Sequence, residues 1–339
     1  MRQLWAAALV ATAAAFELAS FTYSAGEGLI TLTFDEAVQS RTLNASGIVL
    51  QSNATAERAP MQRFRLRGAH PTLGQFLYTT PYNTTETLTL VMRDDDLLEV
   101  QALSDLAVDA KSVWLVAEEG LARAVSDNDR SAAITKPLEV DTYVPDTLQS
   151  EMELYTIDMH EGLICFKFLE PVDRSSLDLS GVILQTDVNV LDVDTGYECR
   201  NVDQDSCVQL TLVNEESKLL DIPCKPTNVS STNNDSVTTW SVVCLNTTTV
   251  EDSLWLNVSL GPTNLNAIKA AYPLGSQAHL TNLALSSPIA NDRGGNAFLT
   301  ISLRPEMALV PEHWIGDQNR PILVSFAVDM DSGQIDLTF

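Results

Sequence analysis

Few side chains in this sequence are spaced like catalytic or metal-binding groups. The four histidines are His70, His160, His279 and His313, and none lies within four positions of another histidine or of a cysteine. This spacing does not match a zinc site. The sequence also contains no G-x-S-x-G turn, no G-x-x-x-x-G-K-[ST] phosphate loop and no C-x-x-C motif. We therefore expect a protein that is not an enzyme and that needs no cofactor.

Two acidic segments are the next chemical features. Asp192–Gly196 and Asp329–Gly333 could each begin a calcium loop, because hard cations prefer carboxylate and carbonyl oxygens. Neither segment has the glutamate that completes an EF-hand loop. Asp and Gly are also common in turns, so we favour acidic turns and keep calcium binding as the alternative. The dipeptide His160-Glu161 has no second histidine and is interpreted as a turn as well.

One basic stripe stands out in an acidic chain. In the segment Arg63–Arg67, strand alternation would bury Phe64 and Leu66 and place Arg63, Arg65 and Arg67 on one outer sheet face. These guanidinium groups could pair with acidic residues of the same domain. The other interpretation is a contact with an acidic neighbouring subunit, which would suit polymerisation.

All five cysteines lie between positions 165 and 244 of the chain. Cys199, Cys207, Cys224 and Cys244 fall in a stretch where long loops would gain from cross-links. We favour disulfides Cys199–Cys207 and Cys224–Cys244, although four cysteines allow three pairings. Cys165 is left over. Because it alternates with Ile164 and Phe166, we expect it to face outward, where it is free, pairs with one of the four, or bonds to another chain.

The N-terminus and the sequons indicate secretion. Arg2 precedes an apolar stretch from Leu4 to Ala13, and Ala13-Ala14-Ala15 fits signal peptidase, so residues 1–15 are predicted to be a signal peptide. No stretch is long enough to span a bilayer. We expect an extracellular or cell-surface protein with N-linked glycans, and the N-x-S/T sequons are at Asn44, Asn53, Asn83, Asn228, Asn234, Asn246 and Asn257.

Composition narrows the class further. The 339 residues carry a net charge of −25, which repels phosphate backbones and excludes nucleic acid as a partner. The chain is long enough for two or more domains. A low content of charged residues (19%) and of aromatic residues (6%), with many Ser, Thr and Asn residues, favours short strands and polar turns. We predict an all-β fold.

An internal repeat divides the chain. An offset of 134 residues places Glu27–Val38 on Glu161–Val172, and a further offset of 171 places Gly162 on Gly333. The predicted domains are residues 16–147, residues 148–320 with a Cys-rich glycosylated insertion at about 186–253, and residues 321–339 as the first strands of a third domain. Because the third copy stops in mid-strand, we expect the sequence to be the front of a longer protein.

Each copy has the same expected elements. Ile30, Leu32 and Phe34 alternate with less buried positions, as in a half-buried strand that follows a glycine turn. Further strands are expected at residues 62–67, 88–91 and 253–258. Short helices are expected at Asp96–Leu103 and Asn264–Ala271, the second with Thr263 as N-cap, at equivalent positions that suggest crossovers between sheets.

The repeat resembles a known kind of module. A strand ending in Phe, an acidic-Glu-(Ala/Pro)-Val segment and a Leu-x-x-Ser-Gly strand resemble the bacterial Ig-like repeats of surface-layer and adhesin-type proteins. The fuller pattern, with Asn264–Lys269 and Asn291–Asn296, resembles repeats of large secreted algal and protist proteins, of which mastigoneme and other surface-fibril subunits fit best. The resemblance implies tandem Ig-like β-sandwiches, although the first copy has Ala37 for the usual proline and lacks the glycine pair of the turn.

These observations suggest a structural role. We expect a subunit of an extracellular glycoprotein filament or cell-surface fibre, whose partners are copies of itself or related Ig-like subunits. Phe16–Tyr23, released by signal cleavage, could add to the sheet edge of a neighbour. The alternative is an adhesion or ligand-binding surface protein built from the same modules.

Overall fold

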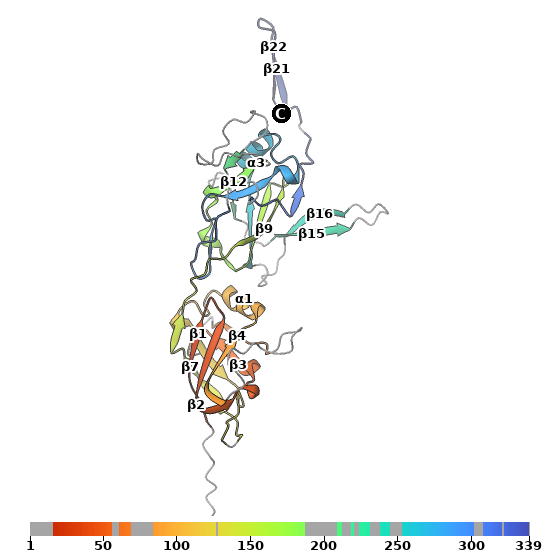
Figure 1. Cartoon of the computed structure of the whole chain (residues 1–339). Coiled ribbons are helices and arrows are strands. Elements are labelled where there is room, and N and C mark those ends of the chain that lie inside the picture. The colour runs from red at the N-terminus through yellow and green to blue at the C-terminus, as the bar shows by residue number, and fades with distance from the viewer. Residues whose placement is uncertain are drawn as a thin grey trace, which may run out of the picture. The chain divides into compact units, whose positions relative to one another are not determined.

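The chain folds mainly as β-strands in several small sheets, with few helices (Figure 1). The computed structural model describes residues 16–55, 61–68, 84–126, 128–186, 209–211, 218–219, 224–230, 238–244, 253–301, 308–320 and 322–338. The chain divides into unit 1, Met1–Gln149 with Asp292–Asn296, and unit 2, Ser150–Asn291 with Ala297–Phe339. The signal peptide predicted at residues 1–15 lies outside the described residues.

Unit 1 contains two four-stranded sheets. We call the first its hairpin sheet, which has the order β5-β2-β1-β8 and consists of β1 (Leu18–Ser24), β2 (Leu29–Gln39), β5 (Thr84–Val91) and β8 (Thr142–Val144). Strands β1 and β2 form an antiparallel hairpin, whereas β8 is parallel to β1. The other, the cover sheet, has the order β4-β3-β6-β7 and consists of β3 (Ile48–Gln51), β4 (Arg63–Arg65), β6 (Trp114–Ala117) and β7 (Ile134–Glu139).

Unit 2 has a similar arrangement, with one more strand in its hairpin sheet and one fewer described strand in its cover sheet. Its hairpin sheet has the order β14-β17-β10-β9-β20, from β9 (Met152–Asp158), β10 (Leu163–Phe168), β14 (Lys218–Leu219), β17 (Trp255–Ser259) and β20 (His313–Ile315). As in unit 1, the last strand, β20, is parallel to the first, β9. The cover sheet has the order β13-β12-β18, from β12 (Val182–Gln185), β13 (Gln209–Thr211) and β18 (Asn282–Leu285).

Three small sheets complete the described strands. They are β11 (Val172–Asp173) with β19 (Asn291–Asp292), β15 (Cys224–Ser230) with β16 (Thr238–Cys244), and β21 (Ser325–Asp329) with β22 (Gln334–Thr338). Single 3-10 turns recur at matching places in the two units, at Ser40–Thr42, Ala45–Gly47 and Ala110–Ser112, and at Arg174–Ser176, Leu179–Gly181 and Ala278–Leu280.

The predicted helices are crossovers between sheets. Helix α1 (Asp94–Ala102) leads from β5 of the hairpin sheet to β6 of the cover sheet, and α3 (Gly261–Ala270) connects β17 to β18 in the same way. Three aspartates in the first turn of α1 suit the positive end of a helix. The expected cap of the second helix is wrong. Leu260 is the N-cap and Pro262 occupies the first turn, so the helix begins before Thr263.

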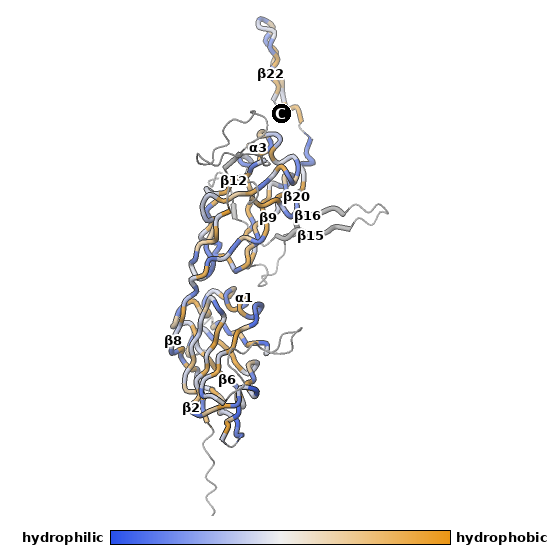
Figure 2. The backbone as a smooth tube through the Cα atoms, in the orientation of Figure 1, coloured by the Kyte–Doolittle hydropathy of each residue, from blue (hydrophilic) through white to orange (hydrophobic). Residues whose placement is uncertain are grey.

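Each unit has its own hydrophobic core between its two sheets. Ile30, Leu32 and Phe34 are buried while the residues between them are half-buried, which confirms the predicted alternation. Hydrophobic residues recur along the strands of both units in Figure 2. In unit 1 they join Ile48 and Leu115 of the cover sheet in one cluster. The matching cluster of unit 2 is separate from that of unit 1.

The segment Phe16–Tyr23 is part of this core, which corrects its expected role. Phe16, Leu18, Phe21 and Tyr23 are buried, and β1 lies between β2 and β8 in the middle of the hairpin sheet. Removing the segment to extend a neighbour's sheet would therefore remove a central strand from unit 1. It is not a free donor strand.

Candidate functional site

The predicted arginine stripe begins on β4, which holds Arg63 and Arg65, and continues to Arg67 just beyond the strand. Phe64 and Leu66 are buried as predicted. Arg65 Nη1 lies 2.7 Å from Glu118 Oε1, and Arg67 Nη1 lies 2.9 Å from Asp95 Oδ2. Arg63 Nη2 donates to Gln51 Oε1 at 2.9 Å. The interpretation as pairing within the domain is the one that the structure shows.

Arg67 also contacts a buried carboxylate on α1. The backbone N–H of Arg67 donates to Asp96 Oδ2 at 3.0 Å, and its Nε lies 3.5 Å from Asp96 Oδ1. Burial raises the pKa of Asp96, although the hydrogen bond and charge of Arg67 oppose the shift. For Asp95, burial alone would raise the pKa, but hydrogen bonds and charges from Arg93 and Arg67 outweigh it and lower the pKa. Through these contacts, Arg67 connects the segment just after β4 to α1.

Cys165 is buried, so the expectation that it lies at an outward-facing, exposed position is wrong. Its side chain is 1% exposed, and the directly opposite residues Thr156 of β9 and Asn257 of β17 are 1% and 0% exposed. Burial raises the pKa of the Cys165 thiol to about 12, although a hydrogen bond from Thr156 acts against this rise. A thiol of this kind is inert. It is free in the structure.

The cysteine-rich insertion is described only in part. Cys224 and Cys244 are directly opposite each other in the β15–β16 register. The Cα atoms of such antiparallel partners lie about 4.5–5.5 Å apart, within the usual span of a disulfide. Cys199 and Cys207 lie outside the described residues. The backbone register suits the predicted Cys224–Cys244 bond, and both bonds stay predictions.

The sequons differ in their accessibility. Asn44 is exposed, and the hydroxyl of Ser46 in the same sequon donates to Asn44 Oδ1 at 2.7 Å. Asn53 is half-buried, and Asn228 lies on β15. Asn257 is fully buried in β17, so the folded unit cannot present it to a glycan. Asn83, Asn234 and Asn246 lie outside the described residues.

The acidic segment Asp329–Gly333 forms the turn between β21 and β22. Asp329 Oδ1 accepts backbone hydrogen bonds from Asp331 at 2.9 Å and from Ser332 at 3.3 Å. Hydrogen bonds from the Ser332 side chain and from these amides lower the pKa of Asp329. The carboxylate therefore stabilises a turn, as we favoured. Asp158 closes the turn at His160-Glu161 in the same way. Asp192–Gly196 lies outside the described residues.

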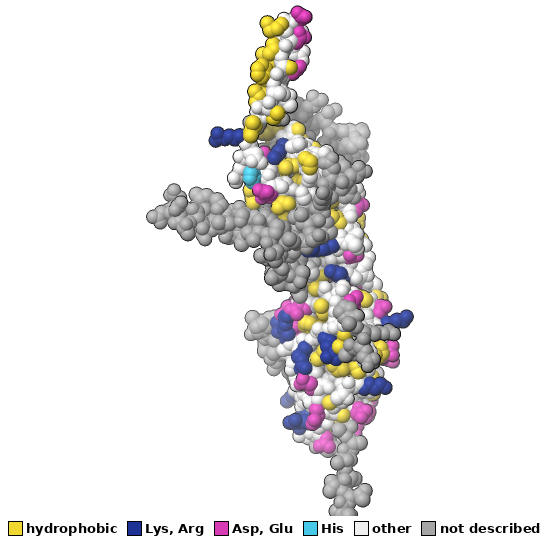
Figure 3. All heavy atoms as spheres, turned by 180° about the vertical axis from the view of Figure 1, so that it is seen from behind, with side chains coloured by type: hydrophobic (Ala, Val, Ile, Leu, Met, Phe, Trp, Pro, Cys, Tyr) yellow, Lys and Arg dark blue, Asp and Glu magenta, His cyan; other side chains and the backbone are white. Residues whose placement is uncertain are grey.

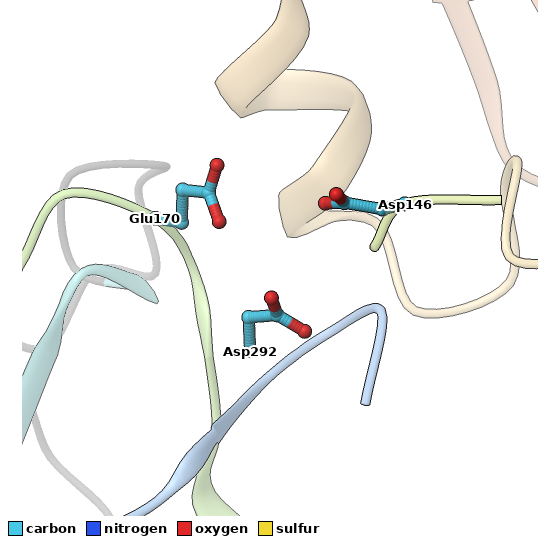
Figure 4. A group of neighbouring side chains, drawn as sticks. All are labelled: Asp146, Glu170 and Asp292. Atoms are coloured by element: carbon cyan, nitrogen blue, oxygen red, sulfur yellow. The ribbon is translucent and has the colours of Figure 1, made fainter. Parts of the chain in front are cut away.

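Two further carboxylates, which the motif search did not single out, meet in unit 1. Oxygens of Asp146 and Asp292 lie within 4.8 Å of each other (Figure 4). Burial raises the pKa of Asp146, the charge of Asp292 raises it further, and a hydrogen bond from Leu148 opposes the shift. Both oxygens of Asp292 accept hydrogen bonds from Asn296. The Asp292 carboxylate thus stabilises a turn that the sequence analysis did mark, at Asn291–Asn296. Glu170, also labelled in Figure 4, belongs to unit 2.

Comparison with known proteins gives no family assignment. No family model matches the chain, and no curated protein matches it in sequence. In the part of the chain that the structure describes, no helix is long and apolar enough to cross a membrane.

Proposed function

We propose that the protein is a structural subunit of an extracellular glycoprotein filament or cell-surface fibre, built from tandem Ig-like β-sandwiches. The observation that carries this proposal is the repetition of one unit. The order β5-β2-β1-β8 of unit 1 recurs as β17-β10-β9-β20 in unit 2, each with a crossover helix and a parallel closing strand. Arrays of such units act as spacers or fibres, because each unit adds length without needing a reaction centre. The resemblance to surface-fibril repeats points the same way.

The edge strands limit how subunits could join. Strand β4 has three residues, two of them arginine, and β7 contains Lys136 and Pro137. Short strands, charges and proline all discourage edge-to-edge pairing. Strand β5 differs, with eight residues and a single described neighbour, β2. In unit 2 the equivalent strand β17 is paired with β14 as well as β10. We therefore propose the outer edge of β5 as a joint between subunits.

Charge makes the assembly sensitive to salt. At a net charge of −25, subunits repel one another at low ionic strength, and added salt screens that repulsion. Light scattering of the purified secreted protein should show larger particles as protein and salt concentrations rise, and electron microscopy should show fibres. A protein that stays monomeric and binds an immobilised glycan or cell receptor would support the adhesion function instead.

A pair of variants tests the proposed joint. Thr87 lies on the edge strand β5, and Thr33 lies directly opposite it on the interior strand β2. Both residues are half-buried. Thr87→Lys should weaken association because a charged edge resists pairing, whereas Thr33→Lys adds the same charge to the same face without reaching the edge. Equal association of both variants and the unmodified chain would exclude the β5 edge as the joint.

A further inference from the structure

The β21–β22 hairpin has one apolar face that nothing in the described structure covers. Phe326 is opposite Leu337, and Val328 is opposite Ile335. These four side chains are 66%, 54%, 48% and 61% exposed, respectively. The other face carries Ser325, Ala327 and Asp336 with Thr338. Hydrophobic side chains gather along this hairpin at the top of Figure 3. A two-stranded hairpin of this kind is at best marginally stable alone.

The hairpin has the register of the first hairpin of each unit. Val328 and Ile335 correspond to Tyr23 and Ile30 of unit 1, and Phe326 and Leu337 correspond to Phe21 and Leu32. The same alignment in unit 2 reaches Ile157 with Ile164 and Tyr155 with Phe166. The connecting turn ends with a left-handed glycine in all three hairpins, at Gly28, Gly162 and Gly333.

In both complete units this face is closed by two further parts. All eight corresponding side chains are 1% exposed or less. They pack in one core with the cover sheet, through Ile48 and Leu50 of β3 in unit 1 and through Val182 and Leu184 of β12 in unit 2. Every strand of a cover sheet and the crossover helix follow the hairpin in the sequence.

The turn glycines show that the β21–β22 hairpin also lacks a crossover helix packed on its turn. A Cβ on Gly28 would lie 3.2 Å from Leu97 of α1, and a Cβ on Gly162 would lie 3.0 Å from Leu265 of α3. The crossover helix thus packs on the turn in each unit. Gly333 has the same backbone conformation, but nothing lies within 4 Å of its Cβ position.

We propose that the apolar face of β21–β22 is a docking face for a cover sheet and crossover helix of the kind that closes the same face in units 1 and 2. Neither described cover sheet is available, because each is already packed in the core of its own unit. A second copy of the chain would bring only another hairpin, and eight side chains bury far less than the roughly 800 Å² per partner of a stable interface. The inference does not depend on filament assembly.

A chimera within the full chain tests whether the hairpin fits such a cover. Leu18–Phe34 is replaced by the sequence of Leu323–Phe339, which has the same length and turn. We expect unit 1 to keep a cooperative unfolding transition and slow hydrogen exchange in β3 and β6. Its melting temperature should fall, because Val328 replaces Tyr23, which stacks on Tyr143 at 6.3 Å between ring centroids. Loss of the transition and of exchange protection would overturn the proposal.

Two matched variants of the chimera test whether unit 1 accepts the grafted hairpin because of its apolar face or would accept any hairpin of that length. Leu337→Asp in the grafted copy places a charge on the apolar face, and Thr338→Asp places one on the polar face of the next residue. The first should abolish exchange protection in unit 1 and the second should preserve it. Equal exchange protection in the two variants would show that the cover sheet does not pack on the apolar face, and it would overturn the proposal.

The unmodified chain tests the choice of occupant. Phe326→Asp with Leu337→Asp at their native positions should leave light scattering unchanged at every protein concentration, because no copy binds this face. Particle size that falls in this variant would identify a second copy as the occupant and overturn our assignment. Filament formation that fails in both proteins, with an intact chimera, would reject the proposed function alone.

Discussion

The outer face of the hairpin sheet, which points away from the cover sheet, differs between the two units. In unit 1 this face carries Thr22, Thr31 and Thr89 at half-buried positions, and Thr31 and Thr89 share a hydrogen bond of 2.9 Å between hydroxyl oxygens. The matching positions in unit 2 are Thr156, Cys165 and Asn257, and all three are buried. The outer face of the hairpin sheet is therefore partly exposed to solvent in unit 1 and buried in unit 2.

The strands beside this sheet also differ between the two units. Unit 2 contains the long segment between β12 and β17, and two of its described strands reach the hairpin sheet. Strand β14 pairs with β17, and β16 lies beside β20. Unit 1 has no counterpart of these strands among its described residues. The described strands of the insertion thus lie at both edges of the unit 2 hairpin sheet, where β14 extends one edge and β16 lies beside the other edge strand, β20.

The largest expected effect is a charge on that face. Cys165→Asp should destabilise unit 2 by about 3–5 kcal/mol, because it buries an uncompensated carboxylate. Thr31→Asp at the matching position should cost unit 1 only about 1 kcal/mol, mainly the hydrogen bond to Thr89. Hydrogen exchange of peptides from each unit measures both values. An equal loss of unfolding free energy in the two units would contradict the difference in burial between the two outer faces.

The turn glycines should give the next largest effect. Gly162→Ala and Gly28→Ala should each destabilise their unit by about 1–2 kcal/mol, because a Cβ is disfavoured at positive φ. The nearby leucine of the crossover helix adds to this cost. Gly333→Ala is the control, since its turn belongs to neither core and its substitution should leave both unfolding transitions in place. Urea unfolding followed by hydrogen exchange would detect a departure from this order.

A smaller effect compares the crossover helices through pH. Asp96 of α1 and Asn264 of α3 are both buried, each four residues before the buried Val100 or Ile268. Because folding raises the pKa of Asp96, the folded protein binds this proton more tightly, and the ionised group lowers stability above that pKa. Asp96→Asn should therefore be more stable than the unmodified chain at pH 7, and the advantage should vanish as pH falls below the ordinary value of 3.8.

Asp95 is the control with the opposite sign. Its pKa is lowered on folding, so its charge contributes stability above 3.8 that is lost as pH falls through the lowered value. Asp95→Asn should be slightly less stable than the unmodified chain at pH 7, and the difference should disappear in acid. Thermal unfolding across pH measures both variants. The same sign for both would refute the assigned causes.

The smallest expected effects come from surface ion pairs. Lys167 Nζ lies 2.6 Å from Glu153 Oε2 in unit 2, and Arg65 pairs with Glu118 in unit 1. Double-mutant cycles to alanine should give coupling energies of about 0.2–1 kcal/mol for each pair. The pair in unit 2 should be the stronger, because its side chains are less exposed to solvent and salt. A stronger coupling for Arg65 with Glu118 would reverse this ranking.

Local pattern was enough to predict the repeated skeleton. The alternation at Ile30–Phe34, the glycine before it and the short crossover helices depend on a few consecutive residues, so each could be recognised in the sequence. The burial of Phe64 and Leu66 follows from the same period of two. The internal repeat then showed that the turn glycine, the alternating strand and the crossover helix form one unit, because they occur in the same order in both copies.

Only the tertiary structure decided which surfaces are covered. A period of two separates the faces of a strand, but it does not say what packs on either face. Cys165 and Asn257 therefore read as outward positions, although they are buried in unit 2. The central position of β1 and the partners of Arg65 and Arg67 likewise depend on residues distant in the chain. Burial and pairing are set by contacts between distant segments, so they become fixed only when the sheets have assembled.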